Sequence, residues 1–306
     1  MEKQTLRAAS RKAGCALLAV CALQLAASLA AVPLRDRMGL GGAAWFHLVA
    51  VLSGMTVLGG AAVGQVMLGG HSFDSGRQKC RPYRWDSVLL IPAGAALCMA
   101  GNAVGVFVEQ MAGRAGIEFQ GGPQPPQAQG LPGFLLLLLT AAALPAVAEE
   151  WLLRGVILPA LQPFGDGFAI ACAAALFALL HQNMEQAPMA FVSGLALGWV
   201  YVRSGRLAVP VAVHLWNNAA AVLLMALPEG AENAYVLALG VLGVLSLIVL
   251  YVRRPKDHRG GRPAPEKIAC ELPAWRRAAN FFFGSAAMVL ALIYFVAMIA
   301  VNTRVG

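Results

Sequence analysis

Five side chains that could take part in hydrolysis lie inside otherwise apolar stretches of the sequence. They are Glu149, Glu150, His181, His214 and Asn218. A carboxylate or an imidazole can take a proton from water, and an imidazole or an amide can donate a hydrogen bond to a developing oxyanion. A charged or strongly polar side chain at membrane depth costs at least ~2.5 kcal/mol on insertion scales, so a functional site is the default interpretation.

The two adjacent glutamates are expected to have different roles. Glu150 and Arg154 lie four residues apart with the acid first, which favours an ion pair on one face of a helix. Glu149 is rotated from Glu150 by about 100° around the same helix. We therefore predict a structural Glu150–Arg154 pair and a Glu149 side chain that faces a water-filled cavity. Pro145 lacks a backbone donor and predicts a kink just ahead of the glutamates.

The two histidines follow the same helical spacing. Phe177 and His181 share one helix face, and His214 and Asn218 share another. Measured from the cytoplasmic ends of the expected helices, Glu149 lies about 16 Å deep, His181 about 20 Å, His214 about 11 Å and Asn218 about 17 Å. This common depth predicts one site that faces the cytoplasm.

The composition predicts an all-α, polytopic transmembrane helix bundle. The chain is 59% hydrophobic and only 12% charged, and its mean hydropathy is +0.67, which is too apolar for a soluble globular protein of this length. Most apolar runs approach the ~20 residues that span a hydrocarbon core. We expect about nine helices, with the site among the fourth, fifth and seventh. The runs are roughly 14–34, 43–69, 86–110, 132–160, 167–182, 187–202, 207–227, 233–252 and 279–301.

The distribution of basic residues predicts the orientation. The formal net charge is +8, which could indicate nucleic-acid binding. However, 18 basic residues fall in one set of loops and 4 in the other, as the positive-inside rule requires of a membrane protein. We therefore expect a cytoplasmic amino terminus, an external carboxyl terminus and no nucleic-acid partner. Cys80 and Cys270 should face the cytoplasm, and the cysteines should be thiols.

Three motifs in this order resemble those of the CPBP family of intramembrane proteases. They are Glu149-Glu150-x-x-x-Arg154-Gly155, Phe177-x-x-x-His181 and His214-x-x-x-Asn218. The family includes the CAAX prenyl endopeptidase and bacterial abortive-infection and bacteriocin-immunity relatives, and the resemblance covers about residues 135–225. It implies peptide-bond hydrolysis inside the membrane. Glu149 and His181 would activate water, while His214 and Asn218 would hold the oxyanion.

A metal ion is left open by these residues. Glu149, His181 and His214 supply one carboxylate and two imidazoles, which is the ligand set of many catalytic zinc sites. No HExxH motif is present, and Asn218 is a better hydrogen-bond donor than zinc ligand. The sequence is therefore compatible with a divalent-metal (zinc) mechanism and with a metal-free glutamate mechanism.

Composition also suggests how the chain is organised. We expect amino-terminal transmembrane helices over residues 1–120, a Pro/Gln-rich external loop over 121–131, and a catalytic transmembrane core over 132–227. Residues 228–306 should form two further helices joined by a basic cytoplasmic loop. Helix packing should use glycines, as in Gly60–Gly64 and Gly194–Gly198.

Two other functions can use the same residues. A transporter could use Glu149 and the histidines as a proton relay, although its halves should then form an inverted repeat, which the sequence does not show. A non-catalytic membrane scaffold would tolerate substitution of Glu149.

For a protease, the partners are the lipid bilayer and a membrane-associated peptide or protein tail. The compact loops and Ala/Gly/Leu-rich helices are typical of a prokaryotic plasma-membrane protein, which argues against a true CAAX substrate.

Overall fold

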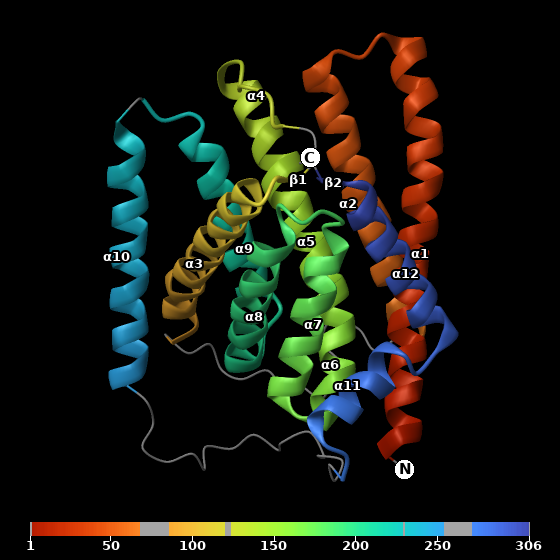
Figure 1. The fold of residues 1–306 in the computed structure, drawn as a ribbon. Helices are drawn as coiled ribbons and strands as arrows, with labels where there is room; N and C mark the ends of the chain where they lie inside the picture. The colour runs from red at the N-terminus through yellow and green to blue at the C-terminus, as the bar shows by residue number, and fades with distance from the viewer. Residues whose placement is uncertain (1, 68–85, 120–123, 229, 254–270, 306) are drawn as a thin grey trace.

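The computed structural model describes residues 2–67, 86–119, 124–228, 230–253 and 271–305, and these form a bundle of helices (Figure 1). The predicted all-α polytopic fold is confirmed. The first half of the bundle contains α1 (Glu2–Met38), α2 (Gly42–Met67), α3 (Asp86–Arg114), α4 (Gly130–Leu137), α5 (Leu144–Glu150) and α6 (Leu158–Leu161). The second half contains α7 (Asp166–Leu180), α8 (Ala187–Ser204), α9 (Ala208–Leu224), α10 (Ala231–Val252), α11 (Ala274–Phe282) and α12 (Ala286–Val301).

Five helices of the described chain are long and apolar enough to cross a membrane. They are Thr5–Met38, Gly42–Met67, Ser87–Arg114, Gly130–Phe164 and Ala231–Val252. The α11–α12 pair, bent by 86°, could form a sixth span. The apolar runs predicted over 167–182, 187–202 and 207–227 form the shorter helices α7, α8 and α9, with 15, 18 and 17 residues. The segment predicted as the catalytic core thus combines the long Gly130–Phe164 span with three shorter helices.

The two ends of the bundle differ in charge. One end carries the start of α1, the end of α2, the α8–α9 turn and the end of α10 (Figure 1). We call it the basic end, because many of the basic residues of the described chain lie there: Lys3, Arg7, Arg11, Lys12, Arg203, Arg206, Arg253, Arg276 and Arg277. The opposite end carries the α1–α2 and α9–α10 turns and the start of α4. Cys80 and Cys270 lie outside the described residues.

The helix that carries the glutamates contains two π-helical turns, η1 (Leu138–Ala143) and η2 (Trp151–Ile157). In η1 the backbone N–H of Leu144 binds the carbonyl oxygen of Leu139, five residues earlier. Pro145 follows directly, near the start of α5. Gly130–Phe164 nevertheless continues as one span of 35 residues. Where the sequence predicted a kink at Pro145, the structure has a widened turn directly before the proline.

Glycines let the helices around the glutamates approach closely. A Cβ added to Gly194 of α8 would lie 2.8 Å from the Cα of Ala174 in α7. A Cβ added to Gly64 of α2 would lie 2.6 Å from a methyl carbon of Val156 in η2. These are closer than any normal contact, so α8 can pack on α7, and α2 on η2, at these points only because neither glycine has a side chain.

Contacts between the first and the last helix of the chain complete the bundle. α1 packs against α12, where the Ser10 and Ser285 hydroxyls are 3.0 Å apart. A short antiparallel ribbon pairs β1 (Ile117–Phe119) with β2 (Thr303–Val305), which the sequence did not predict.

In the described chain Cys15, Cys21, Cys98 and Cys172 are free thiols, as expected. Of the predicted external loop, residues 124–129 are irregular and 121–123 lie outside the described residues.

Candidate active site

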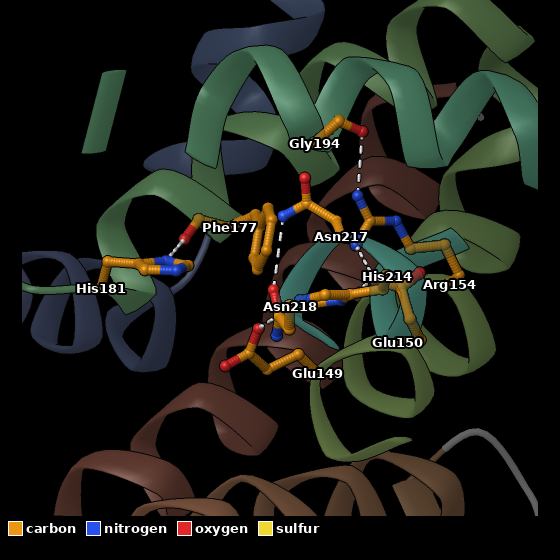
Figure 2. Close-up of polar contacts among 9 residues, drawn as sticks. All are labelled: Glu149, Glu150, Arg154, Phe177, His181, Gly194, His214, Asn217 and Asn218. Carbon is orange, nitrogen blue, oxygen red and sulfur yellow. Dashed lines mark hydrogen bonds and ion pairs between the residues drawn. The ribbon is translucent and has the colours of Figure 1, made fainter. Parts of the chain in front are cut away.

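The predicted ion pair between Glu150 and Arg154 is formed and fully buried. Nη1 of Arg154 donates to Oε1 of Glu150 at 2.7 Å, and both side chains have no exposed area. Nη2 of Arg154 donates to the carbonyl oxygen of Gly194 at 2.9 Å, and the guanidinium lies 5.1 Å from the centre of the Phe177 ring. The missing side chain at Gly194 lets α8 bring this carbonyl close to the arginine. Arg154 thereby joins three helical segments (Figure 2).

His214 connects the two glutamates, a link that spacing along the sequence did not predict. Its Nδ1 lies 3.0 Å from Oε1 of Glu150, and its Nε2 lies 3.7 Å from Oε2 of Glu149. A carboxylate can only accept, so Nδ1 carries a proton and donates to Glu150. Glu149 is 19% exposed whereas Glu150 is completely buried. The two glutamates therefore differ in environment, as their predicted difference in role requires.

His181 lies at the carboxyl-terminal cap of α7, one turn after Phe177. Its Nδ1 is 2.9 Å from the carbonyl oxygen of Phe177, so Nδ1 donates, and in a neutral imidazole Nε2 is then the acceptor. The Phe177 ring meets both imidazoles edge to face, with centroid distances of 4.8 Å to His181 and 5.7 Å to His214. Figure 2 shows the ring between them. Phe177 therefore fixes the positions of both histidines.

Asn218 follows His214 by one turn of α9. Nδ2 of Asn217 donates to Oδ1 of Asn218 at 3.4 Å. This long hydrogen bond uses the acceptor of the Asn218 amide and not its Nδ2 donor. The orientation suits a role in which Asn218 donates to another oxygen.

The four residues with predicted catalytic roles line one cavity of about 800 Å³. Glu149 comes from α5, His181 from the end of α7, and His214 and Asn218 from α9. Segments up to 69 residues apart in the sequence thus meet in one place, as their common depth predicted. The remaining wall combines apolar side chains with uncharged polar ones. The arrangement provides a proton acceptor, two imidazoles and an amide donor beside a space large enough for a peptide segment.

The turn after His181 is held by residues that the motifs did not include. Gln182 has a positive φ of 56°, a conformation that is uncommon for residues other than glycine. Its Nε2 donates to Oε1 of Gln24 in α1 at 2.7 Å, and its carbonyl oxygen accepts from Nδ2 of Asn302 at 2.9 Å. Asn183 adds a hydrogen bond of 3.0 Å to the carbonyl oxygen of His181. Gln24 could have been found by the same signal as the histidines, a polar residue in an apolar run.

The three potential metal ligands do not form a joint ligand set in this structure. Glu149 and His214 are neighbours, whereas Nδ1 of His181 donates to the Phe177 carbonyl, which leaves its Nε2 as the one ring nitrogen that could bind an ion. Across the described part of the chain, no three His, Cys, Asp or Glu side chains are placed to hold one metal ion. The side chains as placed therefore do not form the zinc ligand set that the sequence left open.

The fold and the cavity together define a polytopic helical membrane protein with a carboxylate–imidazole centre between its helices. Residues 131–220 match the family model described as type II CAAX prenyl endopeptidase Rce1-like. This match confirms the resemblance to the CPBP/CAAX protease family and contains all three motifs. Comparison with curated proteins gave no match, and neither did comparison with solved structures.

Proposed function

We propose that this protein is an intramembrane endopeptidase that hydrolyses a peptide bond of a membrane-associated peptide or protein. One observation carries the proposal: Glu149, His181, His214 and Asn218, from three separate segments, line the same cavity. The family match makes proteolysis the activity to test first. We further propose that the protein resides in a prokaryotic plasma membrane with its amino terminus in the cytoplasm, as the basic end indicates.

In the proposed reaction, Glu149 takes a proton from a water molecule. The water oxygen attacks the carbonyl carbon of the scissile bond while Nε2 of His181, which keeps its lone pair, accepts the second hydrogen bond from the water. The carbonyl oxygen becomes an oxyanion. The intermediate collapses when the C–N bond breaks, and the departing amine takes the proton from Glu149, leaving a carboxyl product.

The oxyanion is held by His214 and Asn218 in this mechanism. An imidazolium at His214 can donate through Nδ1 to Glu150 and through Nε2 to the oxyanion at the same time. Asn218 donates through Nδ2. Glu150 and Arg154 are positioning residues, because they contact His214 and α8 but are closed off from the cavity.

The test compares membrane proteomes of cells that carry wild-type protein, Glu149→Gln or Glu109→Gln. Glu109 is an exposed residue of α3 outside the cavity, so Glu109→Gln controls for the loss of a carboxylate. We expect uncut precursors to accumulate with Glu149→Gln alone. Identical proteomes for Glu149→Gln and wild type, at equal protein amounts, would refute the proposed function and favour the non-catalytic scaffold.

A further inference from the structure

The cavity occupies only one half of the bundle. From α1 it is lined between Gln24 and Val32, and from α2 between Trp45 and Thr56. These are the parts of the two helices next to the α1–α2 turn. From α9 it is lined between His214 and Met225, toward the α9–α10 turn. Each of these helices thus contributes the half that lies toward the opposite end, away from the basic end (Figure 1).

Toward the basic end, the cavity has a closed floor. Glu150 and Arg154 are completely buried, and Phe177 is 2% exposed. The next helical turns toward the basic end are packed with apolar side chains that have almost no exposed area: Leu152, Leu153, Val156, Ile157, Leu158 and Leu161. A peptide that came from the basic end would have to displace both an ion pair and a packed core.

The short helix α7 explains why the space opens in the other direction. Its 15 residues rise only about 22 Å, less than the ~30 Å hydrocarbon core. α7 therefore ends at His181 inside the bundle, and its turn into α8 forms part of the cavity wall through Gln182, Asn183 and Gln186. Beyond this turn, no continuation of α7 fills the bundle.

The charge of the cavity wall limits what can enter. Among its described residues Glu149 is the one acidic side chain, and none is Lys or Arg. A free terminal carboxylate would therefore lie near Glu149, and the one cationic partner among the lining residues would be an imidazolium, which the proposed mechanism already uses for the oxyanion. The other polar groups are amides and hydroxyls, which can bind the backbone of an extended peptide. They are Gln24, Ser28, Ser53, Thr56, Gln182, Asn183, Gln186, Asn218, Tyr294 and Asn302.

We infer that the substrate enters from the opposite end as an uncharged, extended segment within a longer chain, not as a carboxyl-terminal tail with its carboxylate bound in the cavity. Since the positive-inside rule places the basic end in the cytoplasm, entry is from the external side of the membrane. The sequence predicted a site facing the cytoplasm, so this inference reverses that expectation. The direction of entry does not depend on the proposed function; only the statement that the bound segment is cleaved rests on it.

The direction of entry is tested with single cysteines in a variant that lacks the six native ones. Ser28→Cys and Ser53→Cys place a thiol on the cavity wall with minimal change in size. Gly41→Cys marks the α1–α2 turn, and Arg203→Cys marks the basic end. Leu237→Cys, on the exposed face of α10, controls for lipid-facing positions. Intact cells are treated with a charged, membrane-impermeant thiol reagent before and after lysis.

We expect Ser28→Cys and Ser53→Cys to be modified in intact cells together with Gly41→Cys. Arg203→Cys should react only after lysis, and Leu237→Cys should react in neither case. Modification of the two cavity cysteines only after lysis, or not at all, would overturn entry from the external side. Labelling does not require catalysis, so this result stands apart from any failure of the proposed function.

The substrate class is tested on the precursors that accumulate with Glu149→Gln. Their cleavage sites, mapped by sequencing the new termini made by the wild type, should lie in segments without Asp, Glu, Lys or Arg on the external side. Cleavage within three or four residues of a natural carboxyl terminus, or inside a charged segment, would overturn this assignment. A complete absence of precursors refutes the proposed function, while the labelling result still decides the direction of entry.

Discussion

Oε1 of Glu150 accepts hydrogen bonds from both Arg154, at 2.7 Å, and His214, at 3.0 Å. The buried ion pair is thus also the support of an imidazole in the cavity. Glu150 is adjacent to Glu149 in the sequence, but its side chain is buried behind the cavity wall, where it contacts Arg154 and His214.

This shared oxygen predicts two separable effects of Glu150→Gln. The amount of folded protein should fall, because Arg154 stays buried and charged without its partner, a loss of about 3–5 kcal/mol for one side of a buried pair. The double variant Glu150→Gln with Arg154→Met should recover part of that stability. It should not recover full peptide cleavage, since His214 still lacks its carboxylate.

Thermal unfolding and cleavage rates of the purified variants check this prediction. Normal yield and stability of Glu150→Gln with no activity would mean that the structural role is wrong. Glu150 would then belong to the catalytic group.

The contacts of Gln182 predict that helices outside the matched segment support catalysis. Gln24→Leu removes the acceptor for the Gln182 side chain, and Asn302→Asp removes the donor to its carbonyl while keeping the shape. Each should lower kcat by ~10- to 10²-fold, because displacing a catalytic group by about 1 Å can cost that much. KM should change less, since the cavity stays open.

Ser10→Ala is the matched control for this pair. It removes a hydrogen bond between α1 and the Ser285 cap of α12 near the basic end, far along the helix from the cavity. If Ser10→Ala lowers kcat as much as the other two variants, the effect comes from general packing of α1 on α12 and not from the turn after His181.

Asn218 is predicted to act as an oxyanion donor. Asn218→Ala should reduce cleavage by ~10²–10³-fold, the usual cost of one such donor, with little loss of stability. Asn217→Ala, which removes only the long 3.4 Å contact to Asn218, should have a smaller effect. Equal losses for both variants, measured as kcat, would argue against direct contact between Asn218 and the reacting oxygen.

Much of the site could be predicted because its spacing is local. Glu150 and Arg154, Phe177 and His181, and His214 and Asn218 are all four residues apart, so helix geometry alone places each pair on one face. The common depth of Glu149, His181 and His214 also followed from counting residues along helices. The helical, membrane-spanning class followed from composition.

The rest depends on how helices pack, which no single segment determines. The hydrogen bond between His214 and Glu150 spans 64 residues, and the contact between Gln182 and Gln24 spans 158. The end of the apolar run at residue 182 predicted the end of α7 closely, but the left-handed conformation of Gln182 could not be predicted from it. Which half of the bundle contains the cavity could not be predicted either, since depth along each helix does not show which side is packed shut.

Metal dependence separates two forms of the mechanism. With the observed geometry we expect purified protein to cleave its substrate without stoichiometric metal and to keep its activity after a strong chelator. Elemental analysis of the wild type beside His181→Ala and His214→Ala checks this. Bound ion in the wild type that is lost with activity in both variants would show that Glu149, His181 and His214 rearrange into a ligand set.

In the proposed mechanism Glu149 takes the proton from the attacking water. Glu149→Gln keeps the size and hydrogen-bonding capacity of the side chain but removes its basicity. The most direct measurement is the cleavage rate of purified Glu149→Gln beside wild type and Glu109→Gln on one precursor identified from the proteomes. We predict a fall of ~10²–10⁴-fold for Glu149→Gln, with unchanged thermal unfolding because a neutral amide is easier to bury than a carboxylate. Cleavage by Glu149→Gln at nearly the wild-type rate would contradict the proposed mechanism and show that Glu149 is not the base.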